Sequence, residues 1–269
     1  MKKTASIILI LISAFTLHAQ QYPEVTIPDS QIRKITSNIV SGEEYELQIM
    51  LPSGYEKSTK KYPVIYVMDS QWDFPLVTAI YGQQFYDGFI PEAIIVGITW
   101  TNKNLKRARD YTPTMLGNNS ETGGADKFLD FIKIELFPFI ESNYKADNNN
   151  RTLMGLSYGG LFTIYALFTH TDMFTGYIAA SPGLDWDNGV MYKFEKLFSD
   201  KNLPKPVSVY MTVGEVENTK SYFEEFVKKM KSSNYQNVRL HSKVIENTGH
   251  SGTKSETFSR GLQYIFEKQ

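Results

Sequence analysis

The sequence contains no cysteine and only four histidines in its 269 residues. Without cysteine the chain has neither a disulfide framework nor a thiolate zinc site. The same absence excludes a lipoprotein, which needs a cysteine after its leader. The hydrophobic fraction is 42% and the charged fraction 21%, values typical of a soluble globular protein. The core must therefore stabilise the fold without crosslinks.

The chain also lacks an excess of one charge. It has 28 Lys and Arg against 29 Asp and Glu. No basic stripe follows any part of the sequence, so we expect no nucleic acid among its partners.

A long aliphatic run occurs only near the start, at residues 7–12, after Lys2 and Lys3. The run fades toward Ala19, which is typical of a secretory signal peptide. We expect residues 1–20 to be this signal, cut after Ala19 or Gln20, leaving an exported, periplasmic or secreted chain. An uncleaved anchor is the alternative, but the run is too short to span a bilayer comfortably. We therefore expect no stable membrane insertion, and a mature formal charge of 26 − 29 = −3.

From residue 44 onward, apolar runs alternate with helical patterns. Continuous apolar runs are typical of strands buried on both faces of a mainly parallel sheet. The expected strands are residues 45–51, 64–68, 93–100, 174–180, 207–213 and 238–245. Apolar residues recur at helical spacing in 125–142, 219–232 and 255–267. The alternation predicts an α/β fold with one sheet flanked by helices, in a single domain over 21–269.

The stretch "RTLMGLSYGGLF", residues 151–162, places a serine between two glycines. A short apolar run leads to Gly155, and a helical pattern follows Gly159. In this strand–turn–helix context, G-x-S-x-G holds the serine at the apex of a sharp turn with its hydroxyl exposed. The helix N-terminus favours negative charge at the same point. The pattern predicts that Ser157 is a nucleophile; a glycine-rich packing turn is the alternative.

A serine hydroxyl needs a base to accept its proton. His18 lies in the expected signal, His170 near the far end of the helix that starts at Ser157, and His241 inside a strand pattern. His250 alone lies in a loop of small residues after the last strand. Elimination therefore predicts His250 as the base.

The base needs an orienting carboxylate, which in such sites lies between serine and histidine in chain order. Glu217 follows the strand at 207–213, and Gly214 can turn the chain so that Glu217 faces inward. Glu217 is the predicted acid. Glu215 is the main alternative, and Asp185 and Asp187 are more distant ones.

An oxyanion hole requires backbone N–H donors near the nucleophile. Tyr158, directly after the serine, is expected to supply one. The loop expected after the strand at 64–68 supplies the other, and we favour Gln71.

Four segments together resemble the Putative esterase family of α/β-hydrolases: residues 157–162, 180–182, 213–217 and 249–251. That family includes esterase D-like enzymes, feruloyl esterases and siderophore esterases that cut enterobactin-type trilactones. The stretch at 109–113, Arg-Asp-Tyr-Thr-Pro, is similar to one in the siderophore-esterase branch. The resemblance covers about residues 30–268. It implies an α/β-hydrolase fold and a serine hydrolase of carboxylic esters, with Ser157 as nucleophile, His250 as base and Glu217 as acid.

The sequence leaves several alternatives for the residues that contact the substrate. Arg107 or Arg109 could meet an anionic or catecholate substrate, or Arg109 could belong to a buried ion pair. Trp72, Trp186 and Tyr158 could form aromatic walls. The segment between the strands at 174–180 and 207–213 is short, with one helical stretch near 190–198. We therefore expect a small or absent lid and an open cleft.

These observations predict an exported serine carboxylesterase whose substrate is a small-molecule ester. A siderophore or aryl ester is the first expectation, and a feruloyl or other acyl ester on polysaccharide the second. No metal or organic cofactor is expected, and the oligomeric state is left open. An acyltransferase with the same site, or a non-catalytic binding protein on this scaffold, are the alternatives.

Overall fold

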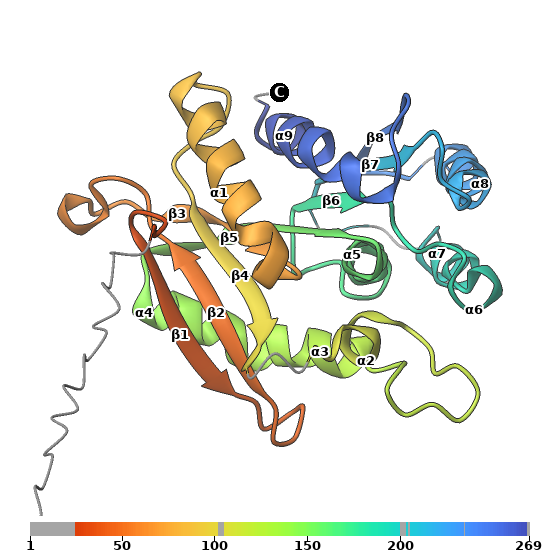
Figure 1. Ribbon diagram of the computed structural model, residues 1–269, viewed down its shortest axis with the longest axis horizontal. Coiled ribbons are helices and arrows are strands. Elements are labelled where there is room, and N and C mark those ends of the chain that lie inside the picture. Colours follow the sequence, from red (N-terminus) through yellow and green to blue (C-terminus); the bar gives the residue numbers. More distant parts are fainter. Residues whose placement is uncertain (1–24, 102–104, 200–202, 204, 234, 268–269) are drawn as a thin grey trace, which may run out of the picture.

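One eight-stranded sheet runs through the computed structural model, which describes residues 25–101, 105–199, 203, 205–233 and 235–267 (Figure 1). The expected signal peptide lies outside the described residues. The strand order is β1-β2-β4-β3-β5-β6-β7-β8. β1, β2 and β4 pair antiparallel, and the six strands from β4 to β8 in that order are mutually parallel.

The strands are β1 Ser30–Thr36, β2 Glu44–Met50, β3 Tyr62–Val67, β4 Ile94–Trp100, β5 Ala146–Leu156, β6 Gly176–Ala180, β7 Val207–Gly214 and β8 Val238–Ile245. The helices are α1 Ser70–Tyr86, α2 Arg107–Tyr111, α3 Ala125–Phe131, α4 Phe137–Asn143, α5 Tyr158–Thr169, α6 Trp186–Gly189, α7 Met191–Ser199, α8 Lys220–Ser232 and α9 Thr253–Phe266. A π-helical stretch, Ile132–Leu136, joins α3 to α4, and short 3-10 turns occur at Tyr55–Lys57 and His250–Gly252.

Helices cover both faces of the sheet. α1 and α9 pack on one face, where Phe74 and Phe258 join the core formed with β3, β4 and β6 (Figure 1). The other face carries the larger core, to which α3, α4, α5 and α8 contribute. The expected α/β-hydrolase architecture, with a mainly parallel sheet between helices, is confirmed. No helix in the described ranges is both long and apolar enough to cross a membrane.

All the strands expected from apolar runs are present, with ends shifted by one or two residues. β1 was not expected, because this edge strand is mostly exposed and has no apolar run. The expected loop at 69–74 is instead the start of α1. The sequence of this helix shows no clear amphipathic pattern, because the polar residues Ser70 and Asp73 are buried while the aromatic residues Trp72 and Tyr86 are exposed.

The segment between β6 and β7 forms two short helices rather than one. The α7 ring of Phe194 stands edge-on to Tyr165 of α5, and Phe198 packs on Phe168, at centroid distances of 4.9 and 5.0 Å. The described part of this segment therefore packs against α5.

A buried carboxylate ties the antiparallel strands to α2. The Oδ2 atom of Asp110 accepts hydrogen bonds from Tyr45 Oη at 2.9 Å and Trp100 Nε1 at 2.7 Å. Arg109 donates to the same carboxylate from Nε at 2.6 Å. Burial, reinforced by Asp110, raises the pKa of Tyr45 above its usual range, so its hydroxyl stays a donor. Asp110 therefore holds β2, β4 and α2 together.

Replacing Asp110 with alanine should strongly destabilise the protein. Tyr45, Trp100 and Arg109 would lose their shared acceptor inside the core, at a cost of about 3 kcal/mol in the free energy of unfolding. Denaturant unfolding measures this cost. Asp172→Ala is the matched control, because Asp172 pairs with Lys133 at the surface and its loss should cost less than about 1 kcal/mol. Equal losses in the two variants would contradict this role for Asp110.

Candidate active site

Ser157 lies at the sharp turn between β5 and α5. Its backbone has φ 60° and ψ −118°, a strained combination for a residue with a side chain. The turn is held by hydrogen bonds from Ser157 N–H to the Ala180 carbonyl (3.0 Å) and from Gly183 N–H to the Ser157 carbonyl (3.2 Å). Strain that the surroundings maintain is typical of a functional position.

Gly155 is required here by close packing. A Cβ atom on Gly155 would lie 2.6 Å from the carbonyl carbon of Gly159, across the same turn. A side chain would therefore push α5 away from the strand end. The G-x-S-x-G spacing is thus explained by the close contact between its two glycines, which leaves no room for a side chain.

Glu217 and His250 meet at the carboxyl ends of β7 and β8. His250 Nδ1 lies 2.6 Å from Glu217 Oε2. The Glu217 side chain is only 4% exposed, whereas that of His250 is 46% exposed. The carboxylate thus contacts one ring nitrogen and leaves Nε2 available to another group.

The second oxygen of Glu217 is also held. Its Oε1 atom accepts hydrogen bonds from Gly214 N–H and from Ser181 Oγ, each at 2.6 Å. Ser181 Oγ also lies 2.9 Å from the Thr253 hydroxyl, at the start of α9. Ser181 lies in the family-like segment at 180–182, and no role was predicted for it. The signal was a small polar residue directly after the strand that lies between β5 and β7.

The alternative acids lie elsewhere. Glu215 is exposed and accepts the Asn247 N–H at 2.9 Å. Asp187 accepts the Thr114 hydroxyl at 2.7 Å, and Asp185 is exposed at the start of α6. Among the four candidates, Glu217 is the one in contact with a histidine in the described residues.

The other described histidines are far less suited to act as a base. His170 caps the end of α5 and contacts Thr169, and His241 stacks on Tyr210 at 4.9 Å. Burial lowers the pKa of both rings.

The predicted nucleophile and base, Ser157 and His250, are not joined by a hydrogen bond in the described structure. In the part of the chain that the structure describes, the hydrogen bond of the His250 ring is to Glu217 and does not involve the Ser157 hydroxyl. Such contacts are often long without substrate and tighten in the complex. The pairing of Ser157 with His250 therefore stays a prediction.

The two residues expected to supply oxyanion donors lie at helix N-termini, and their role stays a prediction. Tyr158 is the first residue of α5, and Gln71 is the second of α1. Trp72 and Asp73 donate to the Asp69 carbonyl, whereas the N–H groups of Gln71 and Tyr158 make no backbone hydrogen bond to a described residue. Both are free donors of the kind that stabilises an oxyanion.

Arg107 lies between two aromatic residues beside these donors. Its guanidinium carbon is 5.1 Å from the Tyr158 ring centroid and 5.7 Å from that of Trp72. Asp69, between β3 and α1, receives two hydrogen bonds of 3.0 Å from it. Burial alone would lower the pKa of Arg107, but these hydrogen bonds outweigh it and raise the pKa. A fixed cation therefore lies beside the candidate nucleophile.

The predicted contacts Trp72, Trp186 and Arg109 are placed differently. Trp72 is 53% exposed. Trp186 is buried edge-on to Tyr158 at 5.3 Å and donates to Thr114. Arg109 is used in ion pairs with Asp110 and Glu43, at 2.6 and 2.8 Å. The structure thus brings Arg107, not Arg109, to the aromatic residues, and Arg109 takes the ion-pair alternative.

The described residues contain no group of three or more His, Cys, Asp or Glu arranged to hold a metal ion.

Comparison with known proteins gives concordant results. Residues 37–247 match the family model described as Putative esterase. The ferri-bacillibactin esterase BesA of Bacillus subtilis (strain 168) is 30% identical over 264 residues, 89% of this chain and 90% of that protein.

Two solved structures are also similar. The crystal structure of BES protein from Bacillus cereus superposes with a TM-score of 0.83 at 26% identity, over 93% of this chain and all of that one. An IroE-like serine hydrolase from Shewanella oneidensis gives 0.79 at 29% identity, over 88% of this chain and 80% of its own. With its family match, fold and relatives in agreement, this chain belongs to the Putative esterase family of ester-bond hydrolases.

Proposed function

We propose that this protein is an exported serine carboxylesterase that works through an acyl-enzyme. The observation that carries the proposal is the 2.6 Å contact of Glu217 with His250 Nδ1. This contact is formed at the same sheet edge as Ser157, which is held at φ 60° on the N-terminus of α5. Base, orienting acid and nucleophile thus occur in the order and environment that the chemistry requires.

In the first half-reaction, Ser157 Oγ attacks the ester carbonyl carbon and its proton passes to His250 Nε2. Glu217 accepts the Nδ1–H bond, fixes the tautomer and stabilises the imidazolium. The developing oxyanion is bound by the N–H groups of Tyr158 and Gln71. The alcohol leaves with the proton from His250.

In the second half-reaction, water takes the place of the alcohol. His250 accepts its proton while the oxygen attacks the acyl carbonyl, and Ser157 Oγ leaves with the proton returned. No cofactor takes part in these steps.

The substrate class is inferred from Arg107 and from the relatives. A guanidinium between the rings of Trp72 and Tyr158 suits an anionic or catecholate aryl group near the scissile ester. BesA is named a ferri-bacillibactin esterase. A siderophore or aryl ester is therefore the first substrate proposed, and a feruloyl or acyl ester on polysaccharide the second.

Export is proposed from the basic and apolar start of the chain at residues 2–12. Cell fractionation followed by N-terminal sequencing tests it: protein found only in the cytoplasm would contradict export, and exported protein that still begins at Met1 would contradict signal cleavage.

Ser157→Ala should abolish hydrolysis of a short-chain nitrophenyl ester, with a fall in kcat of at least about a thousandfold, because no other group forms the acyl-enzyme. Release of nitrophenol measures the rate. A fluorophosphonate probe should label the unmutated protein on Ser157 and leave the variant unlabelled. Ser199→Ala is the control, since its hydroxyl bonds only within α7. Equal activity in the Ser157 variant would rule out this nucleophile.

Glu217→Gln should lower kcat by about a thousandfold or more, because His250 would lose the carboxylate that fixes its tautomer. Glu215→Gln should change kcat little, since that side chain contacts only Asn247. Steady-state kinetics on the same ester compare the two. A larger loss in the Glu215 variant would reverse the assignment of the acid.

An enterobactin-type trilactone should be hydrolysed with a higher kcat/KM than a feruloyl ester, because its catecholates can pair with Arg107. Chromatographic analysis of the products gives both rates. Arg107→Met should reduce the difference by raising KM for the trilactone. A preference for the feruloyl ester would favour the second substrate class, and turnover of neither would exclude both.

A further inference from the structure

A cavity of about 570 Å³ lies beside Trp72, near the start of α1. It is formed by the start of α1 and by two neighbouring antiparallel strands, and it is lined by Glu46, Gln48, Gln71, Trp72, Thr99, Trp100 and Leu105. Gln71 and Trp72 belong both to this cavity and to the candidate site, through the proposed oxyanion donor and the Arg107 contact. The cavity therefore begins where the scissile bond would lie.

Several polar atoms around this cavity are buried without a partner. In the described part of the chain, both side-chain amide atoms of Gln71 and the hydroxyls of Thr99 and Ser70 make no hydrogen bond. Thr99 is 3% exposed and Ser70 fully buried. Leaving buried polar groups unpaired is costly, and native proteins contain few of them. Gln71 and Thr99 both line this cavity, so their unpaired atoms are a sign of a ligand that completes their bonding.

The cavity wall has a definite chemical character. Gln48 and Glu46 project from β2 beside Thr99, with Gln48 Nε2 only weakly bonded to Glu46 Oε1 at 3.4 Å. Trp72, Trp100 and Leu105 supply apolar surface. No described lysine or arginine lines it. The Glu46 carboxylate, beside amide and hydroxyl groups, accepts hydrogen bonds from donors and disfavours anions.

We propose that this cavity is a second substrate subsite, which binds a neutral arm of the ester carrying N–H or O–H donors on an aromatic or aliphatic body. It rests on the proposed function and extends it. Arg107, which contacts the rings of Trp72 and Tyr158, receives the anionic group, and the cavity that Trp72 also lines receives the neutral arm. The site thus distinguishes two chemically different parts of one substrate.

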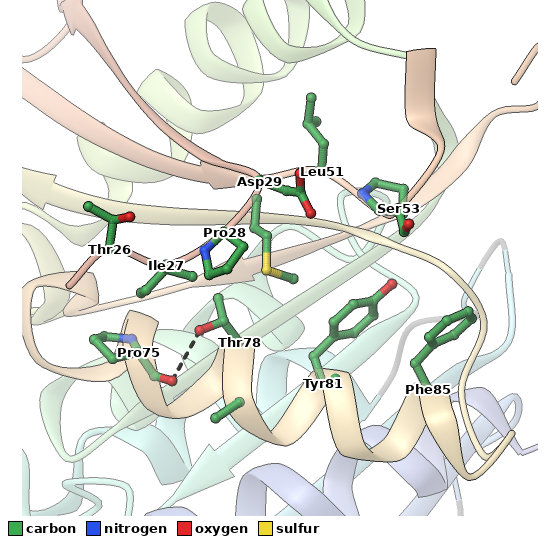
Figure 2. A pocket seen from close by; sticks show the side chains of 14 residues that line it. Thr26, Ile27, Pro28, Asp29, Leu51, Ser53, Pro75, Thr78, Tyr81 and Phe85 are labelled. Carbon is green, nitrogen blue, oxygen red and sulfur yellow. Dashed lines mark hydrogen bonds between the residues drawn. The ribbon is translucent and has the colours of Figure 1, made fainter. Parts of the chain in front are cut away.

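The subsite is not closed at its far end. It shares Gln48 and Gln71 with a cavity of about 690 Å³ over β1, which shares Pro75 and residues 26–29 with a third of about 430 Å³. Figure 2 shows this third cavity, in which Pro75 of α1 lies near Ile27 at one end and Phe85 lies near Ser53 at the other. The three cavities thus lie in succession along α1.

The test compares two esters that differ only in the proposed recognition group. Methyl N-benzoylglycinate carries an amide N–H, and methyl 4-phenylbutanoate replaces the amide with two methylene groups. The ratio of their kcat/KM values cancels changes common to both. In Thr99→Val and in Glu46→Gln this ratio should fall about fivefold, the effect of losing one hydrogen bond.

The variants are chosen to keep the fold. Thr99→Val replaces an unpartnered buried hydroxyl with a methyl group of similar size, which removes a desolvation cost. Glu44→Gln is the matched control for Glu46→Gln, since Glu44 lies on the same strand, pairs with Lys34 and does not line the cavity. The control should keep the parent ratio. A ratio unchanged in both test variants, or lowered equally in the control, overturns the subsite.

A binding measurement separates this proposal from the proposed function. Trp72 and Trp100 are two of three tryptophans in the chain, so intrinsic fluorescence reports occupation of the cavity. N-Benzoylglycinamide should quench the fluorescence of Ser157→Ala, and more weakly when Thr99→Val is added. If neither ester is hydrolysed but this difference appears, the subsite holds and the esterase proposal fails. Equal quenching with and without Thr99→Val overturns the subsite.

Discussion

The site depends above all on how the Glu217 carboxylate is held. One oxygen contacts His250 Nδ1, and the other accepts from Gly214 N–H and Ser181 Oγ. These partners come from the ends of three adjacent structural units: β6, β7 and the turn before α9. A buried carboxylate is tolerable only when its lone pairs are satisfied. The same hydrogen bonds that permit its burial also fix the direction of the imidazole.

Close backbone packing places the remaining groups around this carboxylate. A Cβ atom on Gly214 would lie 2.1 Å from the Thr248 carbonyl oxygen, so the strand end and the His250 turn can approach only because that residue is glycine. Asp69 has a left-handed backbone with φ 53°, and its N–H donates to Tyr111 Oη. With Arg107 bound to its carboxylate, Asp69 connects the start of α1 to α2. These contacts hold the start of α1, where the proposed oxyanion donor Gln71 lies.

Backbone strain and unpaired buried polar groups, which both cost stability, occur together at the carboxyl edge of the sheet. Ser157 and Ser181 both have positive φ, and buried polar atoms without a partner gather around the first turn of α1 and Thr99. Local strain and unpaired polar groups persist where the surrounding fold compensates for them. Opposite charges also occur there. Arg107 lies between Trp72 and Tyr158, while Glu46 lines the cavity that Trp72 also lines.

Local patterns in the sequence were sufficient to predict the alternating strands, most of the helices and the position of the glycine-flanked Ser157 at a turn. Strand burial and tight glycine packing act over a few residues, so they leave a readable periodicity and spacing. By the same reasoning the pattern singled out His250 and favoured Glu217, because only a few polar residues follow the ends of buried strands.

Tertiary structure decided what depends on contacts between distant segments. Only the fold shows Glu217 against His250 while Glu215, two residues away, reaches Asn247. Only the fold assigns Arg109 to Asp110 and Glu43 and puts Arg107 over the aromatic rings. Ser181 had only a weak sequence signal, as a small polar residue after a strand, and the cavity at Thr99 had none. The direction of a side chain at a strand end, and the partner it meets, are set by packing between elements that sequence spacing does not encode.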